Sequence, residues 1–327
     1  MKRPFSFARV TRIPQSMMFM LLAPILLVQA RRTARNTPRL DPATGAETGV
    51  TKVGGTNPKP AFRLLVIGES TAAGVGASDH AEALPGFLAD ALRKHLRRSV
   101  AWSVTGKNGA TVRRVITDLV PSSNGFTSNV YAADGHTFNG LTFTGHAFNG
   151  HTANGHTANG HTANGHTANG HTANGYAANG HGPDLVVVTV GINDLIRRRP
   201  LERWAADLAE LITALRARYL NASVLVAGMP PVHRFPAIPQ PLRMVLGAQA
   251  RAMDKIMREV AHAHGAFHVP MDEAMARDRR LFASDGFHPS PAGYRVWAHD
   301  LAQAISSPAS YPPWPPPRPA YTVQSAL

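Results

Sequence analysis

Beyond residue 60, short apolar runs alternate with longer amphipathic stretches. The runs Leu64–Ile67 and Leu185–Val190 hold almost no polar residues, which is typical of strands covered on both faces of a sheet. Three similar runs complete the predicted strands: Val100–Val104, Val224–Ala227 and Ala266–Val269. Apolar residues at helical spacing predict five helices between and after them: Ala81–Arg97, Thr111–Leu119, Leu201–Tyr219, Leu242–His264 and Pro291–Ile305. Such alternation predicts a single α/β domain with a parallel sheet and right-handed crossovers.

A repeated segment interrupts this pattern. Ten pentapeptides run from Tyr131 to Gly180, and five of them are identical His-Thr-Ala-Asn-Gly units. Recurring Asn-Gly pairs favour turns, and almost nothing here could fill a core. We interpret residues 122–182 as a low-complexity insertion, because each doubling of loop length costs only about 0.6 kcal/mol. A histidine-rich metal-binding tract and a small solenoid are the functional alternatives, since eight of the sixteen histidines lie in this segment.

The N-terminal segment has the composition of a targeting or anchoring element. Four basic residues precede the apolar run Met17–Val28, which is too short to span a bilayer comfortably and is typical of a signal peptide. Val28-Gln29-Ala30 is an acceptable cleavage site, whereas the arginines directly after it favour a retained segment. The alternatives are therefore an exported protein, a membrane-held protein, and a cytoplasmic protein with a buried N-terminal helix.

These features predict the organisation of the whole chain. A signal peptide or membrane anchor precedes a linker and one folded domain, and a proline-rich tail follows that domain. The predicted segments are the anchor at 1–32, the disordered linker at 33–60, the domain at 61–306 interrupted by the insertion, and the disordered tail at 307–327.

Composition narrows the function further. The chain has no cysteine, which excludes disulfides, thiolate metal sites and cysteine nucleophiles. Its formal net charge is +14, but residues 1–60 contribute +8 of it, from ten Lys and Arg against two acidic residues. Because most of the excess precedes the predicted domain, it favours an anionic membrane surface over nucleic acid as a partner.

Small and polar residues follow the predicted strands at four places. Gly68-Glu69-Ser70 ends the first strand, and Gly109 follows the second. Asn193 lies two residues beyond Gly191 after the third, and Asp285 and His288 lie in one loop ahead of the last helix. Each group alone could be a cap or a turn. Doubly wound folds gather the carboxyl ends of strands at one edge, so we expect these loops to converge.

These four blocks resemble those of the SGNH hydrolases, also called the GDSL esterase/lipase family. The resemblance covers about residues 63–306 outside the insertion, and its specific signals are Gly191-Ile192-Asn193-Asp194 and Asp285-Gly286-Phe287-His288-Pro289. It implies a flavodoxin-like three-layer α/β/α sandwich whose five-stranded parallel sheet has the order 2-1-3-4-5. One residue departs from the family pattern: Glu69 stands where the family usually has aspartate.

The resemblance also implies a serine mechanism without metal or organic cofactor. Serine needs a base within hydrogen-bond reach, and His288, oriented by Asp285, would supply it. The oxyanion would be stabilised by the backbone N–H groups of Ser70 and Gly109 and by the side-chain amide of Asn193. His233 is a competing base without a neighbouring carboxylate in sequence, and we predict residues 229–242 to be an acyl-side wall or lid.

The predicted function is therefore hydrolysis of acyl esters, such as aryl esters or lysophospholipids, at the cell envelope. The alternatives are a carbohydrate O-acetylesterase or acyltransferase of the envelope, and a non-catalytic protein that displays the histidine-rich repeats on an inactive hydrolase scaffold. The sequence does not indicate an oligomeric state.

Overall fold

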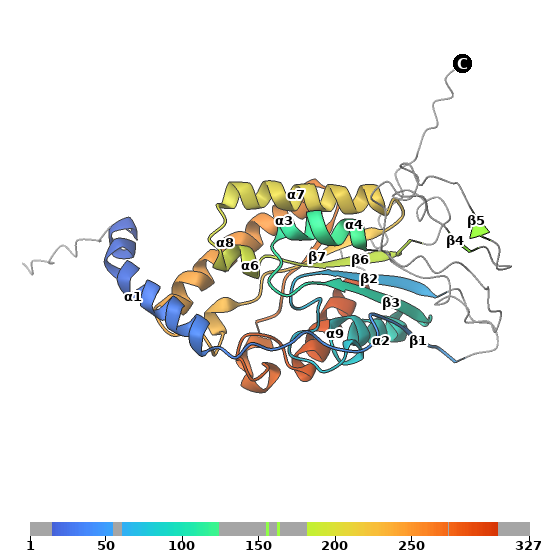
Figure 1. Ribbon diagram of the computed structural model, residues 1–327, viewed down its shortest axis with the longest axis horizontal. Coiled ribbons are helices and arrows are strands. Elements are labelled where there is room, and N and C mark those ends of the chain that lie inside the picture. The colour runs from blue at the N-terminus through green and yellow to red at the C-terminus, as the bar shows by residue number, and fades with distance from the viewer. Residues whose placement is uncertain are drawn as a thin grey trace, which may run out of the picture.

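A computed structural model describes residues 15–54, 61–123, 155–156, 162–163, 182–273 and 275–306. Within these residues, helices cover both faces of one central sheet (Figure 1). The sheet has the spatial order β1-β3-β2-β6-β7-β8, and all neighbours except β1 and β3 are parallel. The strand bounds are β1 Thr48–Thr51, β2 Phe62–Gly68, β3 Val100–Gly106, β6 Leu185–Thr189, β7 Ser223–Ala227 and β8 Phe267–Val269.

The five parallel strands confirm the predicted sheet and its order 2-1-3-4-5. Alternation along β2 shows how the sheet is covered, since Leu64 and Val66 face one helical layer while Leu65 and Ile67 face the other. The first layer contains α2 and α9, and the second contains α3, α7 and α8. The helix bounds are α2 Leu84–Leu96, α3 Val112–Arg114, α4 Val120–Ser122, α6 Ile192–Ile196, α7 Leu201–Arg218, α8 Leu242–Ala263 and α9 Pro291–Ser306.

Several short helical turns complete the layers. A π-helical turn joins α3 to α4, so the predicted helix after the second strand is continuous but irregular. The short elements are η1 His80–Glu82, the π-helical η2 Val115–Leu119, η4 Val232–Arg234, η5 Met275–Arg277 and η6 Arg279–Leu281. The longer helices follow their apolar spacing: Ala250, Met253, Met257 and Ala261 of α8 recur every three or four residues and are all buried.

The sixth strand was not predicted. β1 lies within residues 33–60, for which we predicted a disordered linker, and that prediction is wrong for Thr48–Thr51. β1 pairs antiparallel with the outer edge of β3, from Thr48 opposite Ser103 to Thr51 opposite Val100. An uncovered edge strand leaves a row of backbone groups unpaired, and this short segment satisfies them.

The N-terminal segment forms the helix α1, Gln15–Asn36. Leu26 of this helix is buried, and Leu22 and Ala30 pack beside it against the core. Gln29 ties α1 to α8: its side chain donates to the Gln240 carbonyl at 2.6 Å and accepts from the Leu242 N–H at 3.1 Å. Among the described helices, none combines the length and the apolar character that crossing a bilayer requires.

The repeat insertion lies almost wholly outside the described residues, as does the proline-rich tail. Within the insertion the structure describes two paired two-residue strands, β4 (Gly155–His156) and β5 (Thr162–Ala163). The residue at which the insertion leaves the described part of the fold is held by the domain. Ser123 is buried against Tyr219, whose hydroxyl lies 2.8 Å from the Ser123 hydroxyl.

Candidate active site

The first site loop begins where β2 ends, in the middle of the sheet. Gly68 lies so close to β6 that a Cβ atom there would be 2.0 Å from the Thr189 carbonyl oxygen. The same oxygen accepts a 2.9 Å hydrogen bond from the Glu69 N–H. Only glycine permits this approach, and the chain then turns sharply so that Ser70 follows directly at the carboxyl edge of the sheet.

Ser70 is held in a tight turn that buries most of its surface. Its carbonyl accepts from the Val75 N–H at 3.0 Å, and the Glu69 carbonyl accepts from the Ala73 N–H at 3.0 Å. The Ser70 side chain is aimed at the last site loop, because its Oγ lies 3.0 Å from His288 Nε2. Nucleophile and base are thus within direct hydrogen-bond reach, although 218 positions separate them in sequence.

Asp285 lies on the other side of the imidazole. Its Oδ2 is 2.5 Å from His288 Nδ1, and its Oδ1 accepts from the backbone N–H groups of Phe287 at 2.9 Å and His288 at 3.0 Å. Burial raises the pKa of Asp285, but the hydrogen bonds from the side chain and backbone of His288 outweigh this and leave the pKa below its ordinary value. An ionised Asp285 keeps the proton on Nδ1, so that Nε2 is free to accept the Ser70 proton.

Two backbone donors are available for an oxyanion. Within the described part of the chain, the N–H groups of Ser70 and Gly109 have no acceptor. Gly109 has a φ of +76°, a conformation in which a side chain would be strained even though a Cβ would meet no atom within 4 Å. The turn that carries Gly109 is tied to the nucleophile loop, since the Lys107 N–H donates to the Gly68 carbonyl at 3.1 Å.

Asn193, the third predicted oxyanion donor, is already engaged. Its Nδ2 donates to Glu69 Oε2 at 2.7 Å and to the Ala110 carbonyl at 3.0 Å. An amide has two N–H bonds, so both are used within the protein. Asn193 can therefore reach an oxyanion only when one of these bonds is released or shared.

Glu69 holds this arrangement from beneath the nucleophile. Besides the Asn193 amide, its carboxyl group accepts from the backbone N–H groups of Ile192 and Asn193, each at 3.3 Å. Burial raises the pKa of Glu69 to about 8, and the three hydrogen bonds offset only part of that effect. The glutamate that replaces the family's aspartate therefore bridges the first and third site loops.

Asp194 connects the second and third site loops in a similar way. Its Oδ2 accepts from the Val112 N–H at 3.0 Å, at the start of α3. Burial raises the pKa of Asp194 to about 6, and Asp207 adds to the shift. Sequence reasoning assigned no role to Asp194, and the only signal was its position directly after Asn193.

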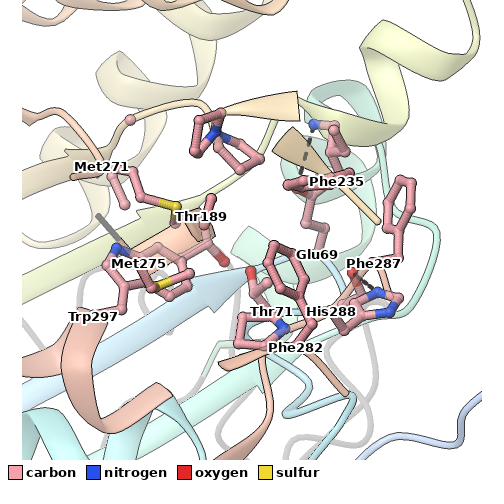
Figure 2. Close-up of a pocket in the computed structure, with 18 of the residues that line it drawn as sticks. Glu69, Thr71, Thr189, Phe235, Met271, Met275, Phe282, Phe287, His288 and Trp297 are labelled. Carbon is pink, nitrogen blue, oxygen red and sulfur yellow. Dashed lines mark hydrogen bonds between the residues drawn. The ribbon is translucent and has the colours of Figure 1, made fainter. Parts of the chain in front are cut away.

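An apolar pocket opens beside Ser70. Figure 2 shows Phe287 and His288 at one end of this pocket and Met271, Met275 and Trp297 at the other. Pro230, Pro231 and Phe235 contribute to its lining and lie in residues 229–242, for which we predicted an acyl-side wall or lid. The remaining lining comes mainly from the following residues, which sequence reasoning missed because they lie on elements distant in sequence: Thr189, Ala227, Met271, Met275, Ala276, Phe282 and Trp297.

The competing base His233 lies elsewhere. Its Nε2 is 3.6 Å from Glu273 Oε1, and it makes no hydrogen bond to Ser70. Among the other histidines, His268 Nε2 lies 2.9 Å from Asp254 Oδ1. The described residues contain no cluster of three or more acidic or histidine side chains arranged to hold a metal ion.

Comparison with known proteins places this geometry in context. The family model described as "GDSL-like Lipase/Acylhydrolase family" matches residues 123–296, slightly more than half of the chain. The matched range contains Asn193, Asp285 and His288 and begins after Ser70 and Gly109.

Individual proteins match this chain at low sequence identity or over only part of its length. A GDSL-like esterase of Mycobacterium tuberculosis, Rv1075c, is 30% identical over 128 residues, which are 38% of this chain and 40% of that protein. The match thus spans less than half of that relative's length. The solved lipase/acylhydrolase of Enterococcus faecalis is 18% identical, with a TM-score of 0.44 and coverage of 75% of this chain and 96% of the other. The solved psychrotrophic esterase EstA of Pseudoalteromonas sp. is 14% identical, with a TM-score of 0.46 and coverage of 74% of this chain and 95% of the other.

Proposed function

Because this chain belongs to the GDSL-like lipase/acylhydrolase family, we propose that it hydrolyses carboxylic esters through an acyl-Ser70 intermediate. The family match confirms the resemblance that the four sequence blocks predicted. The observation that carries the proposal is the chain of hydrogen bonds from Ser70 Oγ through His288 to Asp285.

The proposed reaction follows from these contacts. Ser70 Oγ attacks the carbonyl carbon while its proton passes to His288 Nε2, and Asp285 stabilises the imidazolium that forms. The N–H groups of Ser70 and Gly109, which have no acceptor in the described part of the chain, would stabilise the resulting oxyanion, and Asn193 would join them once its amide is released. Collapse of the intermediate breaks the bond to the alcohol, which takes the proton from His288. Water then attacks the acyl-enzyme by the same steps and regenerates Ser70.

The lining of the pocket favours an apolar acyl or aryl group as the part of the substrate that binds beside Ser70. Its lining is dominated by aromatic, methionine, proline and alanine side chains. Aryl esters and lysophospholipids are the substrates that we propose first. Acetylated carbohydrate and transfer of the acyl group to a second alcohol are the alternative outcomes.

A covalent probe tests the proposal. A fluorescent fluorophosphonate should label the wild-type protein at Ser70, and Ser70→Ala should remove the label. Nitrophenyl esters of increasing chain length, acetylated sugars and lysophospholipid should then give the substrate range, and an added alcohol should reveal acyl transfer. Absence of labelling in a folded wild-type protein would favour the inactive scaffold.

A further inference from the structure

Exposed apolar side chains gather at one end of the molecule. Of the seven large apolar side chains that are exposed in the described part of the chain, four lie on α1 and the first turn of α8. These four form what we call the apolar patch, with their exposed fractions: Ile25 (49%), Leu27 (45%), Val28 (64%) and Met244 (52%). Exposed apolar residues are usually scattered, so this clustering suggests a binding surface.

The patch lies beside the segment that forms one wall of the pocket. Gln29 binds Gln240 and Leu242, at the end of the segment 229–242 that also carries Pro230, Pro231 and Phe235 of the pocket lining. Figure 1 shows α1 leaving the body of the protein at the end where α6 and the first turn of α8 lie. Since α6 begins at the carboxyl end of β6 and contains Asn193, this is the catalytic edge of the sheet.

Charge beside the patch favours one kind of partner. Arg31, Arg32 and Arg35 follow the apolar part of α1, are exposed, and make no ion pair within the described residues. Helix α1 contains no acidic residue. At the end of α6, the exposed Ile196 is followed by Arg197 and Arg198. Apolar side chains flanked by unpaired arginines complement the anionic headgroups and acyl region of a bilayer.

We propose that the apolar patch and the arginines of α1 dock on an anionic lipid bilayer, with α1 lying along the membrane surface. One side of α1 faces the protein, because Leu26 is buried in the core and Gln29 binds the start of α8, so the opposite side is the one available to lipid. Docking in this way brings the catalytic edge close to the membrane, where lipid esters can enter the apolar pocket. This last consequence rests on the proposed esterase function, whereas docking itself does not.

Vesicle flotation with the full chain tests docking. Wild type should float with vesicles of phosphatidylcholine mixed with phosphatidylglycerol, and should bind about tenfold less to phosphatidylcholine alone or at high salt. Leu27→Gln/Val28→Gln and Arg31→Gln/Arg32→Gln should each weaken binding about tenfold. Leu220→Gln and Arg97→Gln are matched controls, because both residues are exposed at other places in the chain, and they should bind as wild type.

Further readouts separate this proposal from its rivals. The Ser70→Ala variant should float with the vesicles as wild type does, even though it cannot hydrolyse esters. Flotation is therefore measured independently of activity, and the docking proposal can be judged even if the esterase proposal fails. The patch variants should hydrolyse a water-soluble ester within a few-fold of wild type. Equal flotation of patch variants and controls would overturn the proposal. So would a patch variant that instead dissociates a dimer in sedimentation, because the patch would then bind a second copy of the chain.

Discussion

Asn193 Nδ2 lies 2.7 Å from Glu69 Oε2, so the amide predicted to polarise the substrate is bound to the residue beside the nucleophile. The second N–H of that amide binds the Ala110 carbonyl. The three loops that carry Ser70, Gly109 and Asn193 are thus linked through one carboxyl group and one amide.

Glu69→Gln should change how the free energy of unfolding depends on pH. The pKa of Glu69 is about 8 in the folded protein and 4.5 in its ordinary state. Between these values the folded state holds a proton that the unfolded state releases, so wild-type stability falls as pH rises from about 4.5 to about 8. Glutamine is neutral throughout and should lack this contribution, which is on the order of a few kcal/mol.

Urea unfolding of both proteins at pH 5 and pH 8 measures this difference. Relative to wild type, Glu69→Gln should be more stable at pH 8 than at pH 5. Groups that do not interact with Glu69 affect both proteins alike and cancel in the comparison, whereas the repulsion between Glu69 and Asp194 is part of the measured difference. Parallel pH profiles for the two proteins would contradict the buried, mainly protonated state of Glu69.

Asn193→Ala should lower kcat by about 10²-fold with little change in KM, because an amide that binds the oxyanion would be lost. Glu69→Gln is the control, because it perturbs the same hydrogen bond while leaving the amide in place. If the amide serves only to hold Glu69, the two variants should show similar, small losses of kcat. Steady-state kinetics with nitrophenyl acetate distinguishes the two results.

His288→Ala should lower kcat/KM by about 10²- to 10⁴-fold, since general acid–base catalysis would be lost. His233→Ala is a matched control: it also follows a strand of the sheet, but it lies beside Glu273 and makes no hydrogen bond to Ser70. Its activity should stay within a few-fold of wild type. Comparable losses in both variants would remove the assignment of His288 as the base.

The sequence predicted the parallel sheet because its buried strands are nearly unbroken apolar runs, such as Leu185–Thr189. It also predicted that the loops of Ser70 and His288 converge, since Ser70 follows a strand and His288 precedes the last helix at the same edge of the sheet. It could not predict β1, whose four residues, Thr48–Thr51, carry no apolar run and are ordered by the free edge of β3. The Glu69 bond to Asn193 was equally hidden, because it depends on side-chain reach across 124 positions.

Deleting residues 131–180 should leave turnover within a few-fold of wild type. The insertion leaves the domain at Ser123 and returns ahead of Asp184, which bonds to Arg63 at the start of β2 and to the Ser223 N–H at the start of β7. Both attachment points thus lie at the amino edge of the sheet, opposite Ser70. Kinetics on a water-soluble ester, with circular dichroism as a check on folding, tests this, and a collapse of activity in a folded deletion variant would place the repeats in the site.

Met275→Trp should shift the preference of the enzyme toward short acyl chains. Met275 lies with Met271 and Trp297 at the end of the pocket away from His288, so a larger ring there fills the space that a long chain needs (Figure 2). We expect kcat/KM for nitrophenyl octanoate to fall at least tenfold while that for the acetate changes little, because a few buried methylenes at about 0.8 kcal/mol each account for such a ratio.

Met244→Trp is the matched control, since Met244 is 52% exposed on α8 and outside the pocket lining, and it should leave the ratio of the two kcat/KM values unchanged. A fall in both esters alike, with an unchanged melting temperature, would mean that the acyl chain does not occupy this end and that the pocket holds the alcohol portion instead.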